Sequence, residues 1–201
     1  MDTRAKNIID QHLRQSAAVK IAALDCCASG ISRAAELIVE SFRQGGKVML
    51  CGNGGSAADA QHLAAEFTSL LRQDFPRPGL PAIALTTDTS YLTARSNDFG
   101  FEQVYSRLVE TLGRPGDVLV GISTSGNSAN ILAALTAARN QRISTIGFTG
   151  AGGGRMQGLC DVLVAVPSSK TQHVQETHIT IGHIVCQLVE ETLFGNAPKP
   201  S

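Results

Sequence analysis

His62 and Glu66 have the spacing and the chemistry of a reactive pair. Residues four apart on a helix lie on one face, a single turn from each other. An imidazole and a carboxylate held in this way can transfer protons or bind a divalent metal ion. The same spacing also occurs in ordinary surface ion pairs, so the surroundings of the pair decide whether it is a candidate site.

The pair follows a short apolar run, Lys47–Leu50, and a glycine-rich turn, Gly52-Asn53-Gly54-Gly55-Ser56. We interpret the run as a buried strand and the turn as the loop that leads into the helix carrying the pair. Glycines let the backbone approach a ligand, and the NH groups at a helix N-terminus suit an anion. A purely structural turn explains the same pattern, because glycine turns between a strand and a helix are common.

A second loop, Ser123-Thr124-Ser125-Gly126-Asn127-Ser128, follows another apolar run. One or two of its residues are expected to be helix N-caps, but four hydroxyl groups around one glycine exceed what capping requires. Hydroxyl and NH groups at a helix N-terminus can bind a phosphate monoester without Lys or Arg. The chain has neither GxxxxGK[ST] nor a GxGxxG after its first strand, which argues against a nucleotide triphosphatase and a dinucleotide enzyme.

A segment near the end of the chain is rich in polar side chains among aliphatic ones: His173, Gln175, Glu176, His178 and His183. A single His on a mostly apolar helix is usually a core residue. Gln175 and His183 lie about 80° apart around a helix, so they can share a face two turns apart. With His62 and Glu66 they offer nitrogen and oxygen ligands for zinc or a similar ion, although spacing alone does not establish a metal.

Three other turns carry polar residues or glycines. Asp98 is expected in a turn after a short helical stretch, since Asn-Asp favours turns. Asp88 is expected beside a helix N-cap and is equally able to face a pocket. We interpret Gly152-Gly153-Gly154 as a flexible turn without a functional role.

The elements that must position these groups alternate between strand and helix after residue 46. Strands are predicted at Val48–Cys51, Ala82–Thr86, Val118–Ser123, Ser144–Thr149 and Val162–Val166, and helices at about Ala57–Leu71, Ser90–Ser96, Phe101–Leu112, Asn127–Asn140 and Gln172–Leu193. This alternation predicts an α/β fold, a doubly wound parallel sheet with helices on both faces. Ligands of such sheets bind beyond the carboxyl ends of the strands, where both loops lie.

Residues 3 to 44 precede the first strand and form a helical arm. Apolar residues at steps of three and four predict a helix that Ser29-Gly30 interrupts, and a second helix from about Ser32 to Phe42. The arm is expected to pack either on another subunit or on its own sheet. With no linker or repeat, we expect one domain over 1–201: the arm to residue 45, an α/β core over 46–195, and a loose tail.

Composition excludes several classes of protein. Among 201 residues, 17 Lys and Arg balance 17 Asp and Glu, so the basic excess that nucleic acid or an anionic membrane requires is missing. No segment has the roughly 18 apolar residues of a membrane span, and the first residues lack the apolar core of a signal peptide. The five cysteines lack paired spacings and are expected to be buried thiols in a reducing compartment, the cytoplasm.

Taken together, the motifs resemble the sugar isomerase (SIS) family, and within it the phosphoheptose isomerases. The resemblance rests on CGNGGS at 51–56, DAQHLAAEFT at 59–68, ALTTDTSYLTA at 84–94, SNDFGFE at 96–102, GDVLVGISTSGNSANI at 116–131 and VQETHITIGHI at 174–184. These enzymes convert sedoheptulose 7-phosphate into D-glycero-D-manno-heptose 7-phosphate, the first step toward the heptose of lipopolysaccharide. The resemblance implies a five-stranded sheet of flavodoxin-like order and a homotetramer in which the N-terminal helices pack between subunits.

The resemblance also implies roles for individual residues. Those implied to bind substrate, with the serines on phosphate, are Asn53, Gly54, Gly55, Ser56, Asn97, Asp98, Ser123, Thr124, Ser125 and Ser128. His62, Glu66, Gln175 and His183 match the ligands of one zinc ion per subunit, and Glu66 and Gln175 also touch substrate. The implied reaction passes through a cis-enediol, with Glu66 as base and His183 as acid on opposite sides of the sugar. Because zinc weakens a bound carboxylate as a base, the two roles of Glu66 compete.

Two positions depart from the family pattern: His173 stands where many members carry Arg, and Arg95 where a small or aliphatic residue is usual. One rival reading is a non-catalytic SIS protein that binds the replication initiator DnaA. Glu66 argues against it, because that group lacks the acidic residue. Another is a sugar-phosphate-binding regulatory module, which would usually need a DNA-binding partner domain, and the sequence shows no basic helix-turn-helix.

Overall fold

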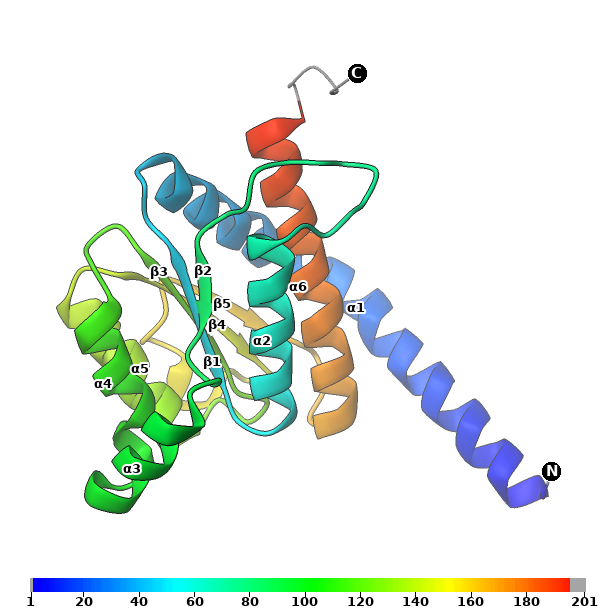
Figure 1. The fold of residues 1–201 in the computed structure, drawn as a ribbon. Coiled ribbons are helices and arrows are strands. Elements are labelled where there is room, and N and C mark those ends of the chain that lie inside the picture. Colours follow the sequence, from blue (N-terminus) through cyan, green and yellow to red (C-terminus); the bar gives the residue numbers. More distant parts are fainter. Residues whose placement is uncertain (1, 196–201) are drawn as a thin grey trace.

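A computed structural model describes residues 2–195 and contains one five-stranded parallel sheet (Figure 1). Its strands are β1 (Val48–Gly52), β2 (Ala82–Ala84), β3 (Val118–Ile122), β4 (Ser144–Thr149) and β5 (Val162–Ala165). They lie in the order β2-β1-β3-β4-β5, and each neighbouring pair is parallel. The predicted doubly wound α/β fold and its flavodoxin-like order are therefore confirmed. The predicted tail, 196–201, lies outside the described residues.

Helices cover both faces of the sheet (Figure 1). They are α1 (Thr3–Arg43), α2 (Gly55–Thr68), α3 (Thr89–Phe99), α4 (Val104–Leu112), α5 (Ala129–Asn140) and α6 (Thr171–Phe194), with the short 3-10 helices η1 (Phe101–Gln103) and η2 (Gly154–Met156). Buried residues of α1, α2 and α6 form one core cluster on the sheet, and those of α4 and α5 form a second. The two clusters sandwich the sheet between them.

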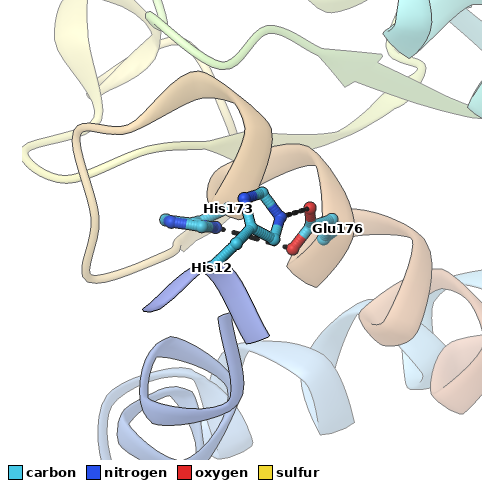
Figure 2. A group of neighbouring side chains, drawn as sticks. All are labelled: His12, His173 and Glu176. Carbon is cyan, nitrogen blue, oxygen red and sulfur yellow. Dashed lines mark hydrogen bonds and ion pairs between the residues drawn. The ribbon is translucent and has the colours of Figure 1, made fainter. Parts of the chain in front are cut away.

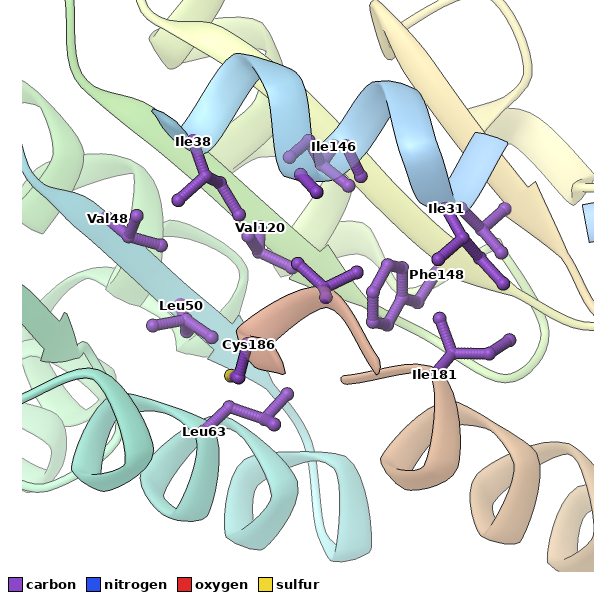
Figure 3. Packing of buried hydrophobic residues seen from close by; sticks show 14 of the residues in the cluster. Ile31, Ile38, Val48, Leu50, Leu63, Val120, Ile146, Phe148, Ile181 and Cys186 are labelled. Carbon is purple, nitrogen blue, oxygen red and sulfur yellow. The ribbon is translucent and has the colours of Figure 1, made fainter. Parts of the chain in front are cut away.

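The central strands are buried along their whole length, which explains their unbroken apolar sequence. Alternate side chains of β1 enter different clusters: Leu50 belongs to the first and Met49 to the second. In the first cluster Leu63 of α2 and Ile181 of α6 lie on the same side as Leu50 and Phe148 (Figure 3). Both helices that carry candidate site residues are thus anchored on one face of the sheet.

The predicted break in the N-terminal arm at Ser29-Gly30 is wrong, because α1 continues through it. Gly30 lies against β5, where an added Cβ would meet Val164 Cγ2 at 3.4 Å and the Leu163 carbonyl oxygen at 3.5 Å. Glycine costs a helix about 1 kcal/mol relative to Ala, and packing of this turn on the sheet offsets that cost. Tertiary contact therefore overrides the local signal.

The arm has two different halves. Its second half packs on the chain's own sheet through Ala23 to Val39, whereas its N-terminal end projects away from the body of the molecule (Figure 1). Large aliphatic side chains remain exposed along it, including Leu13 at 63% and Leu24 at 70%. Within residues 2–195, no helix combines the length and apolar character needed to cross a bilayer.

Two local predictions need correction. Asn97 and Asp98 lie in the last turn of α3 and not in a turn after it, because the helix ends only at Gly100, whose φ of 84° favours glycine. Cys27, Cys51 and Cys186 are buried as predicted, but Cys160 is half-buried and Cys26 is exposed. Cys26 precedes the sheet-facing Cys27 and therefore points to another side of α1.

Candidate active site

The glycine turn after β1 is held from both sides. Gly54 has a φ of 56°, and a Cβ added to Gly52 would overlap the backbone of Ser56. Tyr105 donates its hydroxyl proton to the Gly52 carbonyl at 2.7 Å, in the buried interior. The turn therefore requires glycine at these two positions and directs the start of α2.

α2 and α6 lie side by side, and the three predicted residues His62, Glu66 and His183 meet between them (Figure 1). The Nε2 atoms of His62 and His183 are 2.8 Å apart, and Glu66 Oε1 lies 3.4 Å from His62 Nε2. The helices approach closely here, because a Cβ on Gly182 would lie 2.6 Å from Leu63. His62 remains 48% exposed, so the group is open to a ligand.

Gln175 lies two turns before His183 and covers the start of α2. Its side-chain amide occupies the space that a Cβ on Gly55 would fill, and its Nε2 donates to Asp59 Oδ1 at 3.4 Å. The prediction that Gln175 and His183 share a face of α6 is confirmed, since both meet α2. The structure records no contact of Gln175 with the two imidazoles among the described residues.

Asp59 is a site residue that sequence reasoning missed. It is buried on α2, one turn before His62, and its Oδ2 has no hydrogen-bond partner among residues 2–195. Burial raises the pKa of this carboxyl, while the hydrogen bond from Gln175 and the nearby His62 lower it. The sequence feature that could have identified Asp59 is its position in the motif DAQH at 59–62, one helical turn before His62. Asp59 gives the start of α2 a second carboxyl that faces Gln175.

The side chains of the hydroxyl-rich loop contact one another. Ser128 is the N-cap of α5, but its hydroxyl makes no capping hydrogen bond and instead lies 2.9 Å from the Ser123 hydroxyl. Ser125 Oγ lies 3.5 Å from Ser123 Oγ and accepts from the Asn127 NH. Thr124 and Ser128 are partly exposed and Ser125 is exposed. The prediction that these hydroxyls exceed the needs of capping is confirmed.

A pair of amides joins the two loops. Asn53 in the glycine turn and Asn130 at the start of α5 exchange two side-chain hydrogen bonds, of 2.9 and 2.8 Å. The side-chain amide of Asn53 is therefore engaged in hydrogen bonds within the protein, and these bonds hold the loops after β1 and β3 together at one end of the sheet. Sequence reasoning did not identify Asn130, because 77 residues separate the partners.

The turn at 152–154 supports the hydroxyl-rich loop, which corrects its interpretation as a turn without function. A Cβ on Gly126 would overlap the Gly153 carbonyl oxygen, and one on Gly154 would lie 2.6 Å from the Ser125 carbonyl oxygen. Gly126 itself has a φ of 66°. The two loops thus pack backbone to backbone.

We expect Gly126→Ala to lower the free energy of unfolding by about 2–4 kcal/mol, because it adds steric overlap to the cost of a positive φ. Gly152→Ala is the matched control: φ is 83° and no atom lies within 4 Å of the added Cβ. The control should lose only about 1 kcal/mol. Urea unfolding of both variants measures the difference, and equal losses would contradict a tight loop contact.

The remaining predicted residues lie elsewhere. Asn97 and Asp98 are exposed on α3 and hydrogen-bond to each other at 2.9 Å, and the described residues show no hydrogen bond from them to either loop.

Arg95 stacks on the Phe99 ring at 3.9 Å. His178 is a core residue, with Nε2 3.0 Å from the Thr149 carbonyl oxygen, and burial lowers its pKa to about 4.

The group between α2 and α6 fits a divalent metal ion. Its two imidazole nitrogens and one carboxylate oxygen all lie within 4.8 Å of one another. Zinc binds such ligands at about 2.0–2.1 Å in a tetrahedral arrangement, which places donor atoms roughly 3.3 Å apart. The observed separations of 2.8 and 3.4 Å bracket this value. These three donors leave the fourth position of a tetrahedral site for a further ligand.

Comparison with known proteins identifies the family and close relatives. A family model described as "SIS domain" matches residues 11–150. A phosphoheptose isomerase of Roseiflexus sp. (strain RS-1) is 55% identical over 193 residues, 96% of each chain. The structure of phosphoheptose isomerase GmhA from Neisseria gonorrhoeae is 44% identical with a TM-score of 0.88, covering 93% of this chain and 99% of that one. A phosphoheptose isomerase from Francisella tularensis is 36% identical with a TM-score of 0.88, covering 95% and 100%.

Proposed function

The chain belongs to the SIS domain family, and from this premise we propose that it is a phosphoheptose isomerase. It converts D-sedoheptulose 7-phosphate into D-glycero-D-manno-heptose 7-phosphate, an aldose–ketose isomerisation. The product feeds nucleotide-activated heptose and the lipopolysaccharide core. We also propose that the reaction takes place in the cytoplasm, where the exposed Cys26 thiol stays reduced.

The observation that carries the proposal is the meeting of Glu66 on α2 with His183 on α6, because α2 is the helix that follows the glycine turn. An isomerase of this kind needs a base that takes the proton from C1 and an acid that donates a proton to the neighbouring carbonyl oxygen. Within one chain the carboxylate oxygen of Glu66 and the imidazole nitrogen of His183 lie within 4.8 Å of each other, too close to hold a sugar between them. This corrects the expectation that the two residues act from opposite sides of the sugar: Glu66 and His183 of one chain act from the same side, on adjacent atoms.

Each part of the site has a place in this reaction. Glu66 removes the C1 proton and returns it at C2. His183 donates a proton to the C2 oxygen, which forms the enediol, and takes one back from the C1 hydroxyl as that oxygen becomes the aldehyde. Ser123, Ser125 and Ser128 bind the phosphate through hydroxyl groups at the start of α5. The glycine turn, together with Asn97 and Asp98, binds sugar hydroxyls, and Gln175 covers that end of the site.

We propose that one zinc ion per subunit is held by His62, Glu66 and His183, with Gln175 as a fourth ligand. When bound, the ion supplies positive charge that polarises a substrate oxygen and orients the site. The donor geometry described above supports the first three ligands. Because Glu66 serves both as ligand and as base, its two roles have to be separated by experiment.

A homotetramer is also proposed. Ile8, Ile9, Leu13, Ile21 and Leu24 are exposed along α1. An apolar cavity of about 320 Å³ lies between α1 and α6, next to the exposed Ile184 and Leu188. Exposed apolar surface of this kind is typical of subunit contacts, and sedimentation should give a tetramer.

Incubation with sedoheptulose 7-phosphate, followed by detection of an aldose 7-phosphate, tests the function. We expect turnover, and we expect none with a ketose that lacks the phosphate at working concentrations. The comparisons and the described residues offer no observation in favour of binding to DnaA. Failure of turnover together with binding to a replication initiator would overturn the proposal.

The same assay, repeated after chelation, tests the metal. Protein purified without chelator should contain zinc or a comparable ion, lose activity when it is removed, and recover activity when it is restored. Activity that persists in metal-free protein would show that the ion is dispensable, while leaving the isomerase assignment intact.

A further inference from the structure

A second cluster of metal-type ligands lies outside the active site, where the N-terminal arm crosses the start of α6 (Figure 2). His12 Nε2 on α1 lies 2.7 Å from Glu176 Oε1 on α6. His173 Nδ1, one turn before Glu176, lies 3.6 Å from its other oxygen. Figure 2 shows both imidazoles directed at the same carboxylate. The three donor atoms lie within 4.8 Å of one another, as in the active-site group.

One atom of this cluster lacks a partner. His173 is 2% exposed, and its Nδ1 has no hydrogen bond among the described residues, since 3.6 Å from Glu176 is too long. A buried polar atom without a partner costs about 1–3 kcal/mol. The imidazole is nonetheless aimed into the cluster beside a carboxylate. A cation between the three side chains would satisfy this nitrogen.

The carboxylate of Glu176 carries a negative charge throughout the neutral range. Its pKa is lowered to about 2: the hydrogen bond from Ser16 is the largest cause, burial opposes it, and the hydrogen bonds with His12 and His173 lower the pKa further. The Lys20 ammonium lies 3.9 Å from Glu176 Oε2 and is bonded to Ser16 at 2.6 Å. Lys20 is therefore a competing cation at the edge of the cluster.

We propose that His12, His173 and Glu176 form a second binding site for a divalent transition-metal ion, of which Zn²⁺ is the best match. Two imidazoles and a carboxylate are a donor set that suits zinc, and one donor atom from each side chain lies within 4.8 Å of the other two. His12 and His173 approach different oxygens of Glu176, at 2.7 and 3.6 Å, so both imidazoles face one carboxylate. The bound ion clamps the projecting half of α1 to α6. Its ligand Glu176 directly follows Gln175, so the clamp holds the segment that covers the active site.

The competing explanation is a hydrogen-bonded latch without an ion, in which Lys20 supplies the positive charge. The two explanations make different predictions for Lys20→Met. Removal of the ammonium should strengthen metal binding if the cluster is a metal site, because a repelling charge is lost. In a latch it would only remove a partner of Ser16 and Glu176, with no effect on metal content.

The experiment uses full-length protein without a histidine tag, in a His62→Ala/His183→Ala background that disables the active-site group. Zn²⁺ is added by equilibrium dialysis, and Co²⁺ serves as a spectroscopic probe of nitrogen coordination. We expect one ion per chain. His12→Gln is then added to this background, because Gln keeps a hydrogen bond to Glu176 but removes the imidazole ligand. We expect it to weaken zinc binding by more than about 100-fold, which exceeds the effect of losing a residue that only supports a ligand.

Circular dichroism of the His12→Gln variant checks that the arm stays helical, and Lys20→Met in the same background should bind the ion more tightly. Two outcomes would overturn the proposal: no bound ion in the disabled background, or equal binding with His12 and with Gln at that position. Neither outcome depends on isomerase activity, so the proposed function and this site can fail independently.

Discussion

Replacing Glu66 by Gln is expected to lower kcat for sedoheptulose 7-phosphate by about 10²- to 10⁴-fold, the contribution that a general base usually makes. Gln has nearly the same shape but cannot accept the C1 proton at neutral pH. Glu66 lies on α2 with its oxygen 3.4 Å from His62, and its side chain is 15% exposed, so the substitution leaves the packing unchanged. A coupled or discontinuous assay of aldose 7-phosphate formation measures kcat.

The matched control is Glu110→Gln, which changes an exposed carboxylate on α4 and should leave kcat as it is. Zinc content of both variants separates the two roles of Glu66. Loss of turnover with zinc retained supports the role as base, whereas loss of both supports the role as ligand. Normal turnover by Glu66→Gln would remove Glu66 as the base.

Replacing Arg77 by Ala is expected to lower the free energy of unfolding by about 3–5 kcal/mol, because it leaves a buried carboxylate without its partner. Arg77 Nε lies 2.8 Å from Glu190 Oε1, and both side chains are 0% exposed. The guanidinium also donates to the carbonyl oxygens of Glu66 at 2.7 Å and Phe67 at 2.8 Å, near the end of α2. One side chain thus joins the loop after α2 to both helices of the site.

Arg72→Ala is the control for the same loop. Arg72 pairs with Glu191, the neighbour of Glu190, at 2.6 Å, but the side chains are 31% and 46% exposed. Water screens such a pair, so the expected loss is about 1 kcal/mol or less. Urea unfolding followed by circular dichroism compares the two variants. Equal losses would show that the Arg77 pair contributes no more than a surface pair.

The Arg77 variant also connects stability to catalysis. Because Arg77 donates a hydrogen bond to the Glu66 carbonyl oxygen, its loss frees the end of α2 that carries the proposed base. We expect a lower kcat in Arg77→Ala at temperatures where the variant is still folded, and an unchanged kcat in Arg72→Ala.

Local sequence determined the elements of this protein and the helix faces that carry its candidate site residues. Apolar runs bounded by glycine turns predicted all five strands, and their alternation with helices predicted the parallel sheet. The spacings of His62 with Glu66, and of Gln175 with His183, predicted shared helix faces, because helical periodicity is a property of neighbouring residues. The excess of hydroxyls at 123–128 was visible in the same way.

Only the tertiary structure decided the pairings between distant residues. The Asn53–Asn130 amides, the Arg77–Glu190 ion pair and the contact of His12 with Glu176 join residues 77, 113 and 164 positions apart. No local periodicity encodes such a contact, since each depends on how two separate elements dock. The continuity of α1 through Gly30 has the same origin: the sheet supplies packing that outweighs the preference of glycine to leave a helix.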